Sequence, residues 1–227
     1  MRRLFCLSPE QHHTGPRVDP IIITIIDSGV DTKHPDLQGR LWRNPGEIPD
    51  NGIDDDLNGG QHPQHFTTLI SHSLLWTTGL IDDVYGYNFL ADSSDVSDDY
   101  FHGTHLSGIV GAVCDNDVGV CGINGDGVVI QACKFLDSAG TGLISNAVKC
   151  IDYALKSGAV LTLNSYGGYN QDSPTLRNAI NAAERAGQLF VTAAGALQWI
   201  NRHTPHTSEC IQSENLHGMF ACTLSRG

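Results

Sequence analysis

The chain has 227 residues, a length that suits a single domain with a sizeable buried core. Its 25 acidic and 13 basic residues leave a formal net charge of -12 at pH 7, which argues against nucleic acid or an anionic membrane surface as a partner. No apolar run approaches the roughly 18 residues that a membrane span requires.

Residues 1–20 contain three prolines and open with a basic lead followed by a short apolar stretch. They predict a ragged N-terminal segment, because the apolar stretch is too short for a persuasive secretory signal. The seven cysteines of the chain lack tight pair spacing, which predicts neither a zinc site nor a disulfide framework. Cysteine usage therefore leaves the compartment open.

Residues 21–26 form a nearly unbroken β-branched run, which is typical of a strand buried on both faces of a parallel sheet. Asp27 follows directly, so its carboxylate is expected just past the carboxyl end of a central strand, where open α/β sheets place their sites. An aspartate here also caps turns, and taken alone Asp27 fits that role equally well.

Residues 50–59 form an acidic loop with alternating oxygen side chains before a glycine, the pattern of the first half of a calcium loop. Residues 60–79, a stretch without Asp, Glu, Lys or Arg, separate this loop from the second half of the pattern. In that second half Asp82 or Asp83 would supply a later ligand. A solvated acidic turn accounts for the loop without any metal. The pattern predicts a structural calcium site with these ligands: Asp54, Asp56, Asn58 and Asp82.

Strand and helix patterns alternate along the rest of the chain. Apolar and β-branched runs predict further strands over residues 84–89, 128–134, 159–163 and 189–193. Small-residue and amphipathic patterns predict helices over residues 102–112, 144–156 and 174–187. This alternation predicts an α/β fold, with a parallel sheet, right-handed crossovers and flanking helices.

His102 opens the first of these helices, and a buried helix would hold the imidazole as rigidly as a general base requires. A lone histidine is more often structural than catalytic. Together with Asp27, however, it forms two members of an acid–histidine–nucleophile triad in the order Asp, then His.

Four motifs occur in order with suitable elements between them: residues 25–37, 102–108, 163–168 and 191–195. Through these motifs the chain resembles the subtilisin-like serine endopeptidases, the subtilase family. The resemblance covers residues 21–195 except for residues 60–79. It implies a three-layer, subtilisin-like fold that is incomplete at its C-terminal side.

The resemblance also implies a role for each matching residue. Asp27 would orient His102, and His102 would act as general base toward a serine that hydrolyses peptide bonds. A polypeptide substrate would pair as an added strand along residues 165–167. The side chain before its scissile bond would lie in a pocket lined by residues 193–195. The residues assigned to substrate binding are Ser165, Tyr166, Gly167, Ala193, Ala194 and Gly195. A strand-to-loop turn and tight packing explain these two segments without a substrate.

Two departures from the family pattern concern catalysis. Ala196 stands where the family has an asparagine that stabilises the oxyanion, and loss of that donor in subtilisin lowers turnover about 10²–10³-fold. The Gly-Thr-Ser-Met-Ala segment that carries the nucleophile does not occur in the sequence, and loss of the serine costs roughly 10⁶-fold. The chain as given is therefore expected to be truncated and inactive.

Composition divides the chain in the same way. Residues 21–59 and 80–195 hold 21 of the 25 acidic residues but only three of the 11 histidines. The expected organisation is a ragged segment 1–20, a partial catalytic domain 21–195 with an atypical insert 60–79, and an unrelated tail 196–227. We hypothesise that the insert and the tail are translated intron sequence or a comparable gene-model error. The alternative is a real insertion and a real degenerate tail.

Three functions compete at this point. The first is a serine-type endopeptidase whose full transcript supplies the missing asparagine and serine. The second is a non-catalytic pseudoprotease or peptide-binding fragment, and the third is a calcium-binding acidic module, which leaves the His102 motif unexplained. The resemblance also implies a structural calcium ion, an inhibitory propeptide as a partner, and a secreted or secretory-pathway location. Substrate preference and oligomeric state stay open.

Overall fold

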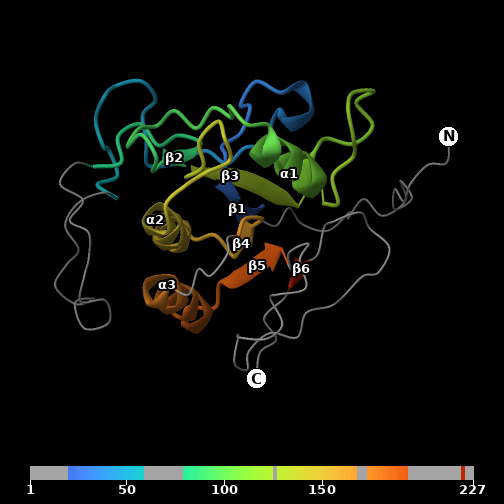
Figure 1. Cartoon of the computed structure of the whole chain (residues 1–227). Coiled ribbons are helices and arrows are strands. Elements are labelled where there is room, and N and C mark those ends of the chain that lie inside the picture. Colours follow the sequence, from blue (N-terminus) through green and yellow to red (C-terminus); the bar gives the residue numbers. More distant parts are fainter. Residues whose placement is uncertain (1–19, 59–78, 125–126, 168–172, 194–220, 223–227) are drawn as a thin grey trace.

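A parallel sheet forms the centre of the molecule, with its strands in the order β2-β3-β1-β4-β5-β6 (Figure 1). A computed structural model describes residues 20–58, 79–124, 127–167, 173–193 and 221–222. The strands are β1 Ile21–Asp27, β2 Gly86–Asn88, β3 Val128–Lys134, β4 Leu161–Asn164, β5 Leu189–Ala193 and β6 Ala221–Cys222. Strands β1 to β5 pair in parallel, and only β6 is antiparallel, to β5.

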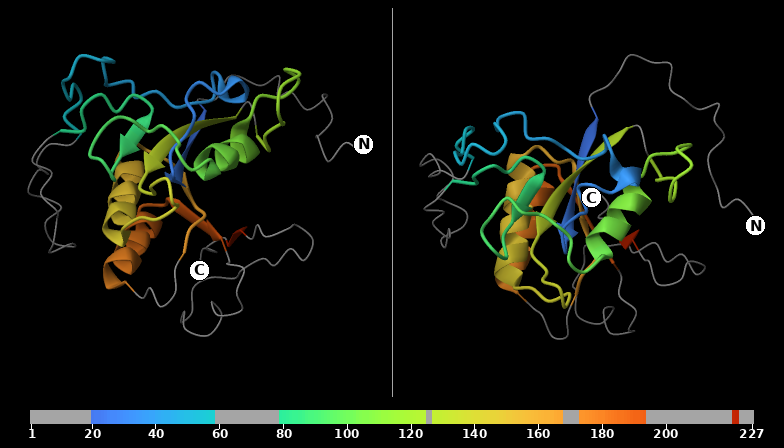
Figure 2. Two further views of the ribbon diagram at one scale, coloured as in Figure 1. Left: turned by 45° about the horizontal axis from the view of Figure 1, so that its top comes forward. Right: turned by 90° about the horizontal axis from the view of Figure 1, so that it is seen from above.

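Helices cover both faces of this sheet. Helices α2 and α3 lie side by side on one face, and α1 lies on the opposite face, as the view from above shows (Figure 2). The helices are α1 His102–Gly111, α2 Ile144–Lys156 and α3 Pro174–Arg185, with one short 3-10 turn, η2, at Pro35–Leu37. The predicted α/β fold, a parallel sheet between flanking helices in three layers, is confirmed.

The central strands are rich in hydrophobic residues because both of their faces are buried. On β1, Ile26 packs into the cluster under α2 and α3, whereas its neighbour Ile25 packs into the cluster under α1. On β3, Ile130 faces the α1 side and Cys133 the α2 side. Alternation of side chains along a strand thus fills two apolar cores, and this explains the unbroken runs in the sequence.

Glycine allows α1 to lie close to the end of β1. A Cβ atom at Gly103 would come within 2.1 Å of the Gly29 carbonyl oxygen, a distance that no side chain tolerates. The small residues of α1 therefore let the helix backbone touch the loop that follows Asp27. Helix α3, by contrast, starts with a conventional cap, since the Ser173 hydroxyl accepts a hydrogen bond from Leu176 N–H.

The absence of a disulfide framework was predicted from the cysteine spacing, and that prediction is wrong. Cys133 of β3 is bonded to Cys150 of α2, and Cys114 is bonded to Cys121 in the loop after α1. The crossover from β3 to α2 brings two residues 17 positions apart face to face inside the core. Such a pair carries no local spacing signal in the sequence.

Other sequence expectations fall partly outside the described residues. Within the predicted insert 60–79 only Gly79 is described, and within the predicted tail 196–227 only Ala221 and Cys222. The predicted strand 84–89 is shorter than expected and spans Gly86–Asn88. Among the described residues, no helix combines the length and the apolarity needed to cross a membrane.

Candidate functional site

Asp27 and His102 meet at the carboxyl edge of the sheet, where the sequence predicted a site. Asp27 is the last residue of β1, and His102 is the first residue of α1. The His102 Nδ1 atom lies 2.8 Å from Asp27 Oδ1 and 2.9 Å from Asp27 Oδ2. Two residues 75 positions apart are thus joined by a bifurcated hydrogen bond.

This contact fixes which nitrogen of the imidazole is available for chemistry. A carboxylate only accepts hydrogen bonds, so His102 Nδ1 carries the proton and donates it toward Asp27. The Nε2 atom then holds the lone pair, and no hydrogen bond from the described residues reaches it. The His102 side chain keeps 29% of its surface exposed, whereas Asp27 is fully buried. A buried acid behind a partly exposed base is the arrangement that proton abstraction requires.

The Asp27 carboxylate is held by its own backbone neighbour as well. Ser28 N–H donates to Asp27 Oδ1 at 2.8 Å. Burial raises the pKa of the Asp27 carboxyl, and the hydrogen bonds from His102 and Ser28 offset part of that rise. The charged form of Asp27 therefore depends on its partners, and an imidazolium at His102 would be its strongest one.

A cleft of about 830 Å³ lies along α1, and neither Asp27 nor His102 is among the residues that line it. Its lining includes the stretch from Asp98 to Phe101 and two side chains of α1, Thr104 and His105. Phe101 has a left-handed backbone with φ 76°, and its side chain is 70% exposed. A bulky residue in that conformation is a strained position of the kind that clusters at functional sites.

The residues predicted to bind substrate follow β4 and end β5. Ser165, Tyr166 and Gly167 come directly after Asn164, the last residue of β4 that pairs with β5. Gly167 is exposed, and no heavy atom of the described residues lies within 4 Å of the place of a Cβ, so the described part of the chain leaves that side open. The Tyr166 hydroxyl donates to Asn164 Oδ1 at 2.9 Å, which fixes the ring inward.

At β5 the predicted pocket residues are only partly described. Ala193 ends β5 and pairs with Ala221 of β6. Ala194 and Gly195 lie outside the described residues. Of the predicted substrate residues, four are therefore placed at the carboxyl edge of the sheet: Ser165, Tyr166, Gly167 and Ala193.

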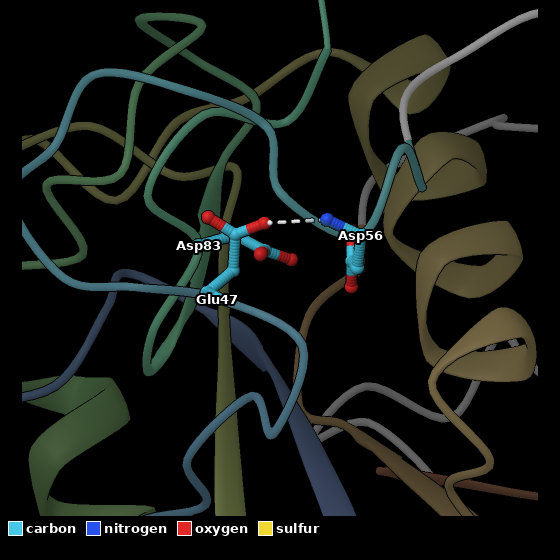
Figure 3. Close-up of side chains that lie close together, drawn as sticks. All are labelled: Glu47, Asp56 and Asp83. Carbon is cyan, nitrogen blue, oxygen red and sulfur yellow. Dashed lines mark hydrogen bonds between the residues drawn. The ribbon is translucent and has the colours of Figure 1, made fainter.

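The acidic loop folds back on residues 79–83, so its two halves meet. The carboxylates of Glu47, Asp56 and Asp83 each offer an oxygen within 4.8 Å of the others (Figure 3). Asn58 joins this group, because its Nδ2 donates to Asp83 Oδ2 at 3.0 Å and to Asp56 Oδ2 at 3.1 Å. Of the four predicted calcium ligands, only Asp56 belongs to the three clustered carboxylates.

The remaining predicted ligands hold the loop itself. Asp82 accepts hydrogen bonds from the Asn51 and Gly52 amides, one on each carboxylate oxygen, at 3.1 Å. Asp54 Oδ1 accepts the Asn58 amide at 3.2 Å. Glu47 was not among the predicted ligands, since it precedes the loop by several residues and carries no spacing signal.

Burial makes Asp83 the unusual member of the group. Its side chain is fully buried, and this burial raises the pKa of the carboxyl to about 7. The pKa is raised even though Tyr153, Asn44 and Asn58 donate hydrogen bonds to the carboxylate. The Tyr153 hydroxyl lies 2.6 Å from Asp83 Oδ2. Burial also raises the pKa of Glu47, and the nearby Asp56 charge adds to that rise. The cluster is thus short of positive charge.

Comparison with known proteins identifies the family. The sequence model of the subtilase family matches residues 19–215, which is most of the chain. The chain belongs to the subtilase family. Subtilisin-like protease 1 of Plasmodium berghei is 33% identical over 203 residues, covering 89% of this chain and 30% of that protein. The thermophilic serine proteinase of a Bacillus species is 30% identical over 173 residues, covering 76% of this chain and 32% of its own length.

The match to the subtilase family differs in length from the relatives and from the predicted domain. The chain spans about a third or less of the curated relatives named here. The match also continues to residue 215, beyond the boundary predicted at residue 195. Among solved structures, a cold-adapted subtilisin-like serine proteinase aligns with a TM-score of 0.51 and 22% identity, covering 77% of this chain and 46% of that one. This likeness supports the fold.

Two features of this subtilase site have no counterpart in the sequence predictions. Lys134 at the end of β3 is buried, and its Nζ donates to the Ser28 carbonyl and to Asp99. Asp98 accepts hydrogen bonds from both sides of the Asp27–His102 pair. Asp98 belongs to an acidic run that is typical of a solvated loop, and Lys134 ends an apolar strand pattern, so sequence pattern alone singles out neither residue.

Proposed function

We propose that this chain carries the acid and the base of a serine-type endopeptidase active site. The observation that carries the proposal is the bifurcated contact of His102 Nδ1 with the buried Asp27 carboxylate, which leaves Nε2 as the free base. Asp27 orients the imidazole and stabilises its charged form, and His102 takes the proton of an attacking hydroxyl. Membership in the subtilase family supports a polypeptide as substrate.

The substrate would lie along the carboxyl edge of the sheet. Residues 165–167 follow β4 as an open segment, and Gly167 leaves room for a second backbone. An extended peptide would pair there as an added strand, which brings its scissile bond toward His102. Ala193, with Ala194 and Gly195, would line the pocket for the side chain before that bond.

The chain as given would not turn over substrate. Neither the Gly-Thr-Ser-Met-Ala segment nor the oxyanion asparagine occurs in the sequence. We propose a catalytic domain over residues 21–195, with residues 60–79 and 196–227 foreign to it. Sequencing the transcript across the codons for Gly59–Leu80 and Gly195–Ala196 tests this division. Loss of both stretches, followed by asparagine and serine codons, is the expected result, and an unchanged reading frame contradicts it.

An active-serine probe tests the enzymatic proposal directly. The chain as given should take no label, whereas the product of the corrected transcript should be labelled. In that product His102→Ala should abolish labelling, and His105→Ala, a change on the same helix, should leave it. A corrected product with the serine in place and no labelling would rule out the protease and favour the second candidate, a non-catalytic peptide-binding protein. The open edge at Gly167 is the observation that favours that candidate.

The acidic cluster fits a structural calcium ion. Its three carboxylates, Glu47, Asp56 and Asp83, offer only oxygens, as this hard cation requires, whereas Asn58 faces them with its Nδ2. The buried Oδ1 atom of Asn58 has no hydrogen-bond partner among the described residues, so rotation of this amide would offer the cation a further oxygen. A bound divalent ion would supply the positive charge that the buried Asp83 lacks. Its role would be to fix residues 44–58 against residues 79–83.

The disulfides support a proposal for the location of the protein. Cys133–Cys150 and Cys114–Cys121 are cross-links of the kind that persist in oxidising compartments. We therefore propose a secreted or secretory-pathway protein. From its membership in the subtilase family we also propose an inhibitory propeptide as a partner of the catalytic domain. Non-reducing mass mapping of the protein isolated from its source should recover both disulfide-linked peptide pairs. Free thiols at all four cysteines would contradict the proposed location.

A further inference from the structure

Asp98 lies in the loop before α1 and accepts five hydrogen bonds from three separate segments. On Oδ1 it accepts the Ser28 hydroxyl at 2.8 Å, the Tyr100 amide at 3.0 Å and the Phe101 amide at 2.9 Å. On Oδ2 it accepts the Thr104 amide at 2.8 Å and the Thr104 hydroxyl at 2.6 Å. One carboxylate thus ties the end of β1, the turn before His102 and the first turn of α1 together.

The donors of Asp98 lie directly after Asp27 and on both sides of His102 in the sequence. Ser28 follows Asp27, and its amide binds the Asp27 carboxylate. Phe101 precedes His102 and Thr104 follows it by two positions. The Ser28 hydroxyl, while donating to Asp98, also accepts the Gly103 amide at 3.0 Å. The hydrogen bonds therefore close a ring around the two residues without touching the imidazole itself.

One further hydrogen bond and one restrained backbone conformation make the ring rigid. The Thr104 hydroxyl accepts the Asp31 amide at 2.9 Å, so the loop after β1 is held at a second point. The left-handed backbone of Phe101 is unfavourable for a bulky residue and persists only where its surroundings fix it. Asp98 supplies that restraint, because it accepts the amides of Tyr100 and Phe101 at the turn.

The electrostatics of Asp98 agree with a permanently charged acceptor. Burial raises the pKa of the Asp98 carboxyl, but the hydrogen bonds from Thr104, Tyr100 and Ser28 outweigh it, and the pKa lies below its usual value. Its charge also sits at the N-terminal end of α1, where a helix favours an anion. The bonds to Asp98 are therefore charge-assisted, which makes them shorter and stronger than neutral ones.

We propose that Asp98 is a positioning residue of the active site: it fixes the end of β1 and the start of α1 so that His102 Nδ1 faces Asp27. Asp98 touches neither the substrate nor the imidazole in this arrangement, and it acts through Ser28, Phe101 and Thr104. The proposal rests on the proposed roles of Asp27 and His102 as acid and base. It assigns a function to a carboxylate that no motif of the sequence selects.

The tautomer of His102 measures this positioning without any need for catalysis. An imidazole held against Asp27 carries its proton on Nδ1, whereas an unrestrained one distributes it over both nitrogens. Long-range ¹H–¹⁵N spectra of the labelled full chain distinguish the two forms. Comparison with His102→Ala assigns the imidazole signals of His102. The spectra are recorded at a pH high enough that these signals no longer change with pH, so that the imidazole is neutral.

Asp98→Asn is the decisive variant, because it keeps the size of the side chain. Its NH₂ group must face either the donors on Oδ1 or the Thr104 donors on Oδ2, and amide N–H groups cannot accept from either. The ratio of Nδ1–H to Nε2–H tautomer at His102 should fall about tenfold or more. Asp95→Asn is the matched control: among the described residues the Asp95 carboxylate accepts hydrogen bonds only from Ser97 of the same loop, so the ratio should stay unchanged.

Thr104→Val keeps the proposal testable if Asp98→Asn does not fold. Valine replaces the hydroxyl that donates to Asp98 and accepts the Asp31 amide, and the ratio should fall in the same direction. Thr104→Ser should restore it. A wild-type ratio in both Asp98→Asn and Thr104→Val, in folded protein, overturns the role of Asp98 alone. A wild-type protein without the Nδ1–H tautomer contradicts the Asp27–His102 pair, and with it the proposed function.

Discussion

We expect the buried carboxylate of Asp83 to make the stability of this protein depend on both pH and divalent cations. Its pKa is raised from 3.8 to about 7 by burial. The folded state therefore holds the Asp83 proton more tightly than the unfolded state does. Stability from this group is fully present below pH 4, and it is lost as the pH rises toward 7. The direction is opposite to that of an ordinary ion-paired aspartate.

The magnitude follows from the size of the pKa difference. One pKa unit corresponds to 1.36 kcal/mol, so a rise of roughly three units costs about 4 kcal/mol of unfolding free energy at pH 8 in cation-free protein. Glu47 changes in the same direction, because its pKa is also raised. The effect of Asp83 must therefore be isolated by comparison with Asp83→Asn, whose amide stays neutral at every pH.

Urea unfolding in the presence of a chelator, at pH 4.5, 6 and 8, measures this difference. The unfolding free energy of the wild type should fall relative to Asp83→Asn by about 3 kcal/mol over that range, because the rest of the change lies below pH 4.5. Calcium at pH 8 should restore the wild type and leave Asp83→Asn nearly unchanged, because the variant lacks a charged ligand. Asp152→Asn, an exposed carboxylate paired with Lys156 on α2, serves as the control and should respond to calcium like the wild type.

Two results would refute the reasoning. A difference between wild type and Asp83→Asn that stays constant with pH in chelator would mean that Asp83 is charged at no cost. Equal stabilisation of both proteins by calcium would place the ion elsewhere. Either result can be read from the same set of unfolding curves, since each protein is measured with and without calcium.

Three further predictions concern the core and the active-site edge. Gly103→Ala should destabilise the fold by about 1–3 kcal/mol in urea unfolding and lower the His102 Nδ1–H signal, because a Cβ would come within 2.1 Å of the Gly29 carbonyl. Replacing Cys133 and Cys150 together by alanine should cost about 3 kcal/mol or more by the same assay, from the loop of 17 positions that their bond closes. The free-energy advantage of wild type over Asp98→Asn should be largest at neutral pH and shrink below pH 4, because the Asp98 pKa is lowered. An advantage that is equal at pH 3 and pH 7 would contradict the last.

Regular elements were predictable where their signal is local. The strand at residues 128–134 and the helix at residues 144–156 have the bounds read from the sequence, because hydrophobic runs and periodicity report burial directly. Strand β2 is shorter than its apolar run. It pairs with only three residues of β3 at the edge of the sheet. The chain beyond Asn88 then turns back, so that the backbones of Ser93 and Asn88 exchange hydrogen bonds.

The site was predictable where a residue stands at the boundary of an element. Asp27 ends a central strand and His102 opens a helix, and the topology brings such boundaries to one edge of the sheet. The choice between Asp82 and Asp83 was not predictable in this way. Asp82 has a left-handed backbone with φ 55°, which turns its carboxylate to the amides of the loop and leaves Asp83 facing Tyr153. Spacing in the sequence does not record such a turn.

Acidic residues alone do not mark a cation site in this protein. The loop before α1 is as acidic as the loop that contains Asp56, yet Asp98 has five donors and a lowered pKa, and Asp99 is paired with Lys134. Asp83 has three donors, is fully buried and has a raised pKa. Burial that exceeds the supply of donors leaves a carboxylate in need of a positive charge, whereas sufficient donors turn the same side chain into a structural anchor. By this criterion we expect a cation beside Asp83 and none at Asp98, where the donors already balance the charge that we propose holds His102 in place.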